Sequence, residues 1–253
     1  MKNTFNWKTF GILLGLSLVS VACVFPYVIS VQGEVLKKIG QPLWIIFVAQ
    51  LIQCLILFSI AIALGLFFAK KINFQLPLIS ALLEKSGAEK IFKDIFGISV
   101  LAGAASAAAI YILDTLFTVQ GAEISTHQNY APVWQKLLAA MYGGTTEEIL
   151  MRLFLLTFFI WIGMKIMRRD QPSKTGIIIS IILAAVIFGL GHLPITASVT
   201  ALTPVVILRA VVLNGIAGVV FGWLFWKKGL ESAMLAHFTA DIFLLTLLPL
   251  LFK

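Results

Sequence analysis

Long apolar runs recur along the chain, and short polar segments separate them. We predict seven membrane-spanning helices, over 10–31, 43–69, 95–119, 134–167, 176–193, 205–226 and 232–252. Runs of about 20 apolar residues match the thickness of the hydrocarbon core of a bilayer. An eighth span would result if the long run at 134–167, or the glycine-interrupted run at 205–226, were two helices.

Three other segments complete this pattern. The run at 10–31 is longer than the core of about 7–15 residues that a signal peptide has, so we predict an uncleaved first span. The polar stretch 73–94 alternates apolar and charged residues, which predicts one or two amphipathic helices at the membrane surface. The segment 120–132 has no Lys or Arg, so we expect an outward-facing loop in which His127 is solvated.

Composition supports a membrane protein and excludes several other classes. The chain has 253 residues, 60% hydrophobic and 12% charged, with a mean hydropathy of +1.02. Soluble domains have about 45–50% apolar and about 25% charged residues. We therefore predict an all-α polytopic helix bundle, a single integral membrane domain over 1–253. Within this domain, the spans over 1–120 have no distinctive motif, and residues 131–252 form the core that carries the candidate site residues. Cys23 and Cys54 lie in separate runs and are expected to be packing residues.

The net charge of +8 is explained by basic residues in short loops. Thirteen of the 19 Lys and Arg residues fall at one side if the N-terminus is cytoplasmic, although Lys37 and Lys38 oppose this orientation. We expect the lipid bilayer as a partner and no nucleic acid. The expected location is a bacterial plasma membrane.

Three charges interrupt the apolar run of the fourth span. Glu147, Glu148 and Arg152 lie within it, although a charge at the centre of a bilayer costs about 2.5–3.5 kcal/mol. Glu148 and Arg152 are four residues apart, so they share a helix face and can pair. Glu147 points about 100° away and stays free for chemistry. A purely structural ion pair is the alternative, but it accounts only for Glu148 and Arg152.

Histidines lie in two of the later spans. His237 and Asp241 are four residues apart and share a face, and so do Phe188 and His192. Asp114, in the third span, is expected to bond to a neighbouring helix. The polar residues inside the spans after position 140 are Glu147, Glu148, Arg152, His192, Arg209, Asn214, His237 and Asp241.

Two chemistries fit a glutamate and two histidines. In one, Glu147, His192 and His237 bind Zn²⁺ and leave one position open for water. In the other, no metal is needed, because Glu147 acts as general base on a water and a histidine assists it. The remaining polar groups would then stabilise the oxyanion.

The three ordered motifs resemble those of the CPBP family, also called Abi or CAAX-type intramembrane proteases. They are Glu147-Glu148-x-x-x-Arg152, Phe188-x-x-x-His192 and His237-x-x-x-Asp241. The resemblance implies an intramembrane endopeptidase for peptide or membrane-protein substrates. CAAX-processing members cleave after a prenylated cysteine, and many bacterial members act in bacteriocin self-immunity or peptide signalling. The family is described both as zinc metalloproteases and as metal-independent glutamate proteases.

The resemblance also implies roles for these residues. Glu147 would activate the water, and Glu148 would pair with Arg152. His192 would orient the water or polarise the carbonyl, and His237 would contribute to the oxyanion site. The last motif of the family usually ends in asparagine, whereas this chain has Asp241. A carboxylate cannot donate to an oxyanion, so Asp241 must be protonated, bind a metal or only orient His237.

Two alternatives from other classes stay open. Buried Glu, His and Asp side chains also relay protons in transporters. A catalytically inactive scaffold or immunity protein would use the same residues only to hold helices together. The depth of the two histidines is a further difficulty. At about 1.5 Å per residue, His192 lies roughly 27 Å and His237 roughly 12 Å from the inner ends of their spans.

Overall fold

The computed structural model describes residues 5–119 and 131–252, so His127 and most of the predicted outer loop lie outside the described residues. Within this part of the chain the structure is helical and has no strand. Its elements are α1 (Trp7–Ile39), α2 (Leu43–Lys71), α3 (Pro77–Glu84), α4 (Ala88–Val119), α5 (Val133–Tyr142), η2 (Gly143–Glu147), η3 (Ile149–Leu156), α6 (Thr157–Ile166), α7 (Lys174–Gly191), α8 (Leu193–Ala197), α9 (Pro204–Lys228), α10 (Leu230–Ile242), η4 (Phe243–Leu247) and α11 (Leu248–Leu251).

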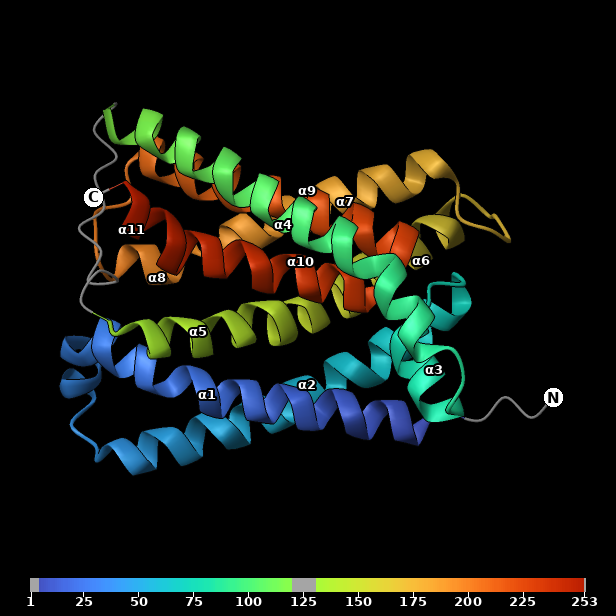
Figure 1. Ribbon diagram of the computed structural model, residues 1–253, viewed down its shortest axis with the longest axis horizontal. Helices are drawn as coiled ribbons and strands as arrows, with labels where there is room; N and C mark the ends of the chain where they lie inside the picture. The colour runs from blue at the N-terminus through green and yellow to red at the C-terminus, as the bar shows by residue number, and fades with distance from the viewer. Residues whose placement is uncertain (1–4, 120–130, 253) are drawn as a thin grey trace.

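The long helices run side by side along one axis of the molecule (Figure 1). Seven helical spans in the described ranges are long and apolar enough to cross a membrane: Trp7–Ile39, Leu43–Lys71, Ala88–Val119, Val133–Ile166, Lys174–Ala197, Pro204–Lys228 and Leu230–Leu251. The predicted all-α membrane helix bundle with seven spans is therefore confirmed. Exposed apolar side chains such as Ile52, Ile56, Leu101 and Ile179 face outward from it, as lipid contact requires.

The first helix is longer than the sequence predicts. The segment between the predicted spans 10–31 and 43–69 is largely helical, because α1 continues to Ile39. Pro26 lies inside the helix, and Gln32 has non-helical φ and ψ of −117° and 20°. The helix ends at Gly40, whose φ of 69° is the left-handed conformation that glycine adopts easily. The polar residues within 32–38 end the apolar run, but they continue the helix beyond the predicted span.

The predicted amphipathic segment forms α3 and the first turns of α4. The helix α3 lies directly against the start of α10, where Leu230 is fully buried. Leu230 N and Gln75 O are 3.4 Å apart, and Glu231 Oε1 accepts a hydrogen bond of 2.8 Å from Ile79 N. The last span therefore begins inside the protein, beneath α3, whereas α7 begins at the exposed Lys174. This difference in starting depth accounts for the unequal positions of His192 and His237 along their spans.

Small residues bring pairs of helices into close contact. A Cβ atom at Gly103 of α4 would collide with the Ala236 carbonyl of α10, and one at Gly218 of α9 would lie 2.7 Å from the Cβ of Ala185 in α7. Small residues allow such approach in membrane bundles, where the apolar lipid supplies little drive for association. The contacts α4–α10 and α7–α9 set the positions of the helices that carry His192 and His237.

An ion pair joins α4 to α9. Arg209 Nε and Asp114 Oδ1 are 2.6 Å apart, and both side chains are partly buried. The expectation that Asp114 bonds to a neighbouring helix is confirmed. Both cysteines are free.

We predict that Gly103→Val destabilises the protein, because the added methyl groups overlap the backbone of α10. Overpacking of this kind costs about 1–3 kcal/mol. Gly97→Val is the matched control, since Gly97 lies on the same helix and a Cβ there meets nothing within 4 Å. Thermal unfolding in mild detergent should give a lower midpoint for Gly103→Val than for Gly97→Val. Equal midpoints would contradict the packing described here.

Candidate active site

The fourth span changes its helical geometry around the glutamates. Two π-helical segments, η2 and η3, flank Glu148 and join α5 to α6 without a break. The Thr146 hydroxyl donates to the Tyr142 carbonyl, and Thr157 Oγ1 donates to Leu153 O at 2.5 Å. Such side-chain bonds to the preceding turn often accompany helix distortion. π-helical turns are rare and frequent at functional sites, so this segment is notable on its backbone alone.

Glu148 is the buried centre of the site. Its side chain is 0% exposed, and it has partners on two helices. Arg152 Nε lies 3.2 Å from Glu148 Oε2, and His237 Nδ1 lies 2.8 Å from Glu148 Oε1. The pairing with Arg152 matches the face shared at four-residue spacing. The bond to His237 was not predicted, because it joins α10 to a different span.

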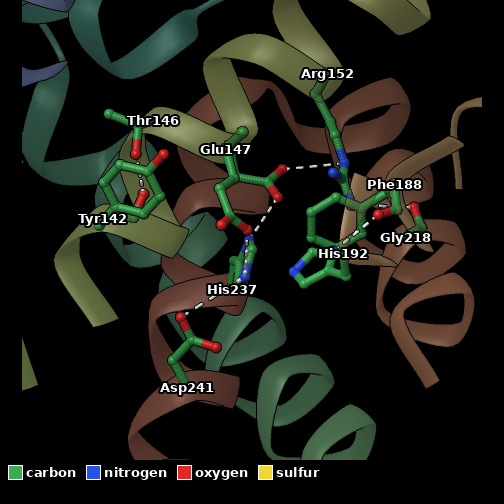
Figure 2. Close-up of polar contacts among 10 residues, drawn as sticks. Tyr142, Thr146, Glu147, Arg152, Phe188, His192, Gly218, His237 and Asp241 are labelled. Carbon is green, nitrogen blue, oxygen red and sulfur yellow. Dashed lines mark hydrogen bonds and ion pairs between the residues drawn. The ribbon is translucent and has the colours of Figure 1, made fainter. Parts of the chain in front are cut away.

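Arg152 is enclosed by aromatic rings. Its guanidinium carbon lies 5.2 Å from the ring centre of Phe188 and 5.6 Å from that of Phe221. Its Nη2 donates to the Gly218 carbonyl at 3.3 Å. Arg152 therefore connects the fourth span to Phe188 of α7 and to Gly218 of α9 (Figure 2).

His237 stands between the carboxyl groups. With Nδ1 bonded to Glu148, its Nε2 lies 3.8 Å from Glu147 Oε2 and 3.7 Å from Asp241 Oδ2. The ring of Phe221 stacks on it at 4.8 Å between centroids. The imidazole is thus fixed on one edge and one face, and its free edge points toward Glu147 and Asp241.

His192 ends α7. Its Nδ1 lies 2.8 Å from the Phe188 carbonyl oxygen, and its ring meets that of Phe188 edge-on at 4.7 Å. Since a carbonyl only accepts hydrogen bonds, Nδ1 carries the proton. The other ring nitrogen lies on the side that faces His237 in Figure 2. The aromatic neighbour expected from the spacing of Phe188 and His192 is present.

One cavity brings the predicted residues together. It has a volume of about 270 Å³, and Glu147, His192, His237 and Asp241 all line it. Glu148 and Arg152 are not among its lining residues and lie behind it. The remaining lining residues are Val24, Tyr27, Ile110, Ala139, Tyr142, Gly143, Phe188, Leu213, Asn214, Ala217, Phe221, Ala240, Leu244 and Leu245.

Three polar lining residues were not assigned to the site from the sequence. Tyr27 and Tyr142 contribute hydroxyl groups, and Asn214 contributes an amide. Asn214 Nδ2 donates to Ala210 O at 2.8 Å, which leaves its second N–H free for a ligand. Asn214 could have been assigned to the site from the sequence, because it is a polar residue in the middle of an apolar span. The sequence has no comparable feature that indicates the two tyrosines.

The donor set does not fit a metal ion as it lies. Among residues 5–119 and 131–252, no three His, Cys, Asp or Glu side chains are arranged to hold one. Glu147, His192 and His237 were the proposed zinc ligands, and zinc binds nitrogen and oxygen at about 2.0–2.2 Å. We therefore derive no step through zinc.

The comparison with known families covers the region that holds the site. Residues 129–243 match the family model described as Type II CAAX prenyl endopeptidase Rce1-like. Over this region the chain is similar to that family. The match is consistent with the CPBP or CAAX-type family, so the family resemblance predicted from the three motifs is confirmed. At family level it supports a CAAX-type intramembrane endopeptidase. No curated protein and no solved structure matches the chain.

We predict that Arg152→Met strongly destabilises the protein, because it leaves the Glu148 carboxylate buried without its cation. Breaking a buried pair from one side costs about 3–5 kcal/mol. The double variant Glu148→Gln/Arg152→Met should recover much of the lost stability in detergent unfolding. Lys93→Met is the control, because the Lys93–Glu89 pair is exposed, and its midpoint should match that of the wild type. A double variant no more stable than Arg152→Met would contradict this account.

Proposed function

We propose that the protein is an intramembrane endopeptidase in which Glu147 acts as general base on a water molecule. The observation that carries the proposal is the difference between two adjacent glutamates. Glu148 is fully buried and paired, whereas the Glu147 side chain is 25% exposed and lines the cavity with both histidines. Its substrate class is a peptide or a membrane-associated protein.

The reaction needs one proton to move twice. Glu147 takes a proton from the water while the water oxygen attacks the carbonyl carbon of the scissile bond. The carbonyl oxygen becomes an oxyanion, and a tetrahedral intermediate forms. When the C–N bond breaks, protonated Glu147 gives its proton to the departing nitrogen. One positioned base that later acts as acid typically contributes about 10²–10⁴ in rate.

The two histidines are better placed to accept a hydrogen bond or to position Glu147 than to donate a proton. In neutral His192, Nδ1 carries the proton for the Phe188 carbonyl, so Nε2 accepts a hydrogen bond and can orient the attacking water. His237 is held by Glu148 and faces Glu147, which makes it a positioning residue for the base. Asp241 sits beside the same edge of His237, in space that Gly143 leaves open by having no side chain.

The oxyanion then needs a donor from elsewhere in the cavity. Asn214 has one amide N–H that Ala210 does not use, and it lines the same space as Glu147 and His192. A preorganised amide is a donor of the kind that stabilises oxyanions, and its removal typically costs about 10²–10³ in kcat. We therefore assign Asn214 to the carbonyl oxygen of the substrate.

The first test is cleavage of quenched peptides by the protein in mild detergent. Glu147→Gln should lower turnover at least about 10²-fold while leaving the unfolding midpoint near that of the wild type. Wild-type activity should persist after chelator treatment and dialysis. Glu89→Gln, at an exposed position on α4, is the control and should cleave normally. Normal cleavage by Glu147→Gln would refute the role of Glu147, and chelator-sensitive activity would refute a metal-free mechanism.

The second test separates chemistry from binding. Asn214→Leu should lower kcat about 10²-fold and change KM little, because the amide acts on charge that develops in the transition state. Asn214→Asp has nearly the same volume and no amide donor, so it should be impaired at least as much. A rise in KM with unchanged kcat would make Asn214 a substrate-binding residue instead.

A further inference from the structure

The cavity extends in one direction from the reactive groups. The spans that hold α5 and α10 run in opposite senses, and their levels are set where Gly144 meets Phe238. Glu147 and His237 lie at one end of the cavity. The other lining residues of these two spans all lie toward the start of α5: Ala139, Tyr142 and Gly143 on one, and Ala240, Asp241, Leu244 and Leu245 on the other.

Two further helices give the same direction. The bond of 2.6 Å from Ser30 Oγ to Gln135 Oε1 fixes the level of α1 against α5. At that level Tyr27 lies beyond Glu147, again toward the start of α5, and Ile110 lies in the last third of α4. In the opposite direction the buried Glu148 and Arg152 side chains fill the space. The cavity is therefore closed behind Glu147 and extends toward the end of the bundle where α4 ends and α5 begins.

That end of the bundle carries few basic residues. Of the 19 Lys and Arg residues, Lys37, Lys38, Lys136 and Arg209 lie there in the described chain, and Arg209 is paired with Asp114. Twelve others lie at the opposite end: Lys8, Lys70, Lys71, Lys85, Lys90, Lys93, Lys165, Arg168, Arg169, Lys174, Lys227 and Lys228. Short loops rich in Lys and Arg stay in the cytoplasm. The lysine-poor end, on the left in Figure 1, is thus the non-cytoplasmic one.

A groove with a mixed polar and apolar lining lies at this same end. It has a volume of about 700 Å³ and is lined by residues 29–37 of α1 together with Gln41, Leu43, Ser198 and Val199. Its first residue on α1, Ile29, is within one turn of Tyr27 in the cavity, and Ser198 follows α8, which begins directly after His192. The groove offers hydroxyl and amide groups, which suit the hydrogen-bonding groups of an extended polypeptide.

We infer that the substrate is a polypeptide on the non-cytoplasmic side of the membrane, which enters the cavity from the lysine-poor end and lays its flanking residues in the groove at 29–37. The inference rests on the proposed endopeptidase function and narrows its substrate class. A lipidated C-terminus held at the cytoplasmic surface would approach the closed side, where Glu148 and Arg152 block the way.

Sidedness of cleavage tests this directly. A membrane-impermeant quenched peptide is given to spheroplasts, which expose the non-cytoplasmic face, and to sealed inverted vesicles from the same cells. We expect cleavage by spheroplasts, and cleavage by inverted vesicles only after detergent is added, with Glu147→Gln inactive throughout. Cleavage by sealed inverted vesicles, with none by spheroplasts, would overturn the inference. Absence of cleavage even in detergent would count against the endopeptidase function itself.

Thiol labelling tests the direction of access without relying on activity. In a Cys23→Ala/Cys54→Ala background, Ser198→Cys should react with an impermeant maleimide added to spheroplasts. Ser86→Cys, exposed at the opposite end, should react only after permeabilisation. Tyr27→Cys, inside the cavity, should follow Ser198→Cys. The reverse pattern would overturn the inference whether or not a peptide is cleaved.

The groove can be tested separately. Ser198→Trp should fill part of it, and this should raise KM for long peptides while kcat, and KM for peptides too short to reach the groove, stay unchanged. Equal KM values for wild type and Ser198→Trp with long peptides would exclude the groove as the binding place of the flanking residues.

Discussion

The site depends on one carboxylate that has been taken completely out of solvent. Charges inside a membrane protein persist only with partners, and Glu148 has two, Arg152 on its own span and His237 on α10. Arg152 extends the connection to the Gly218 carbonyl on α9. One buried group thus fixes three spans against each other at the level of the cavity. Glu147, its neighbour in sequence, is left facing the open side.

The sequence could predict most of the fold because the bilayer imposes it. Apolar runs must be long enough to span, and seven of them correspond to seven helices. The four-residue spacing of Glu148 and Arg152 also predicts their pairing, since both lie on one helix. The predicted ends of the helices are less accurate where polar residues continue a helix beyond its apolar span, as at 33–39 of α1.

What the sequence could not predict are contacts between elements. Nothing in the pattern of α10 indicates that His237 bonds to Glu148, or that α3 covers the start of α10 at Leu230. Counting residues from the ends of the spans placed His192 and His237 at different depths, because that count assumed that every span begins at the membrane surface. The π-helical segments are equally hidden, since no residue pattern in 143–156 distinguishes a π turn from an α turn.

The π-helical segments around Glu148 have a consequence for how such a site can arise or be lost. A π turn is equivalent to an α-helix that carries one inserted residue. Removing a single residue from 143–156 would let a π turn relax to an α turn while α5 and α6 keep their places, and the residues within the segment would shift by one position, about 100° around the helix axis. The glutamates would then lose their alignment with α10 although every residue type survived. Related chains must therefore preserve the spacing of the residues along this helix, as well as their identities, to keep this chemistry.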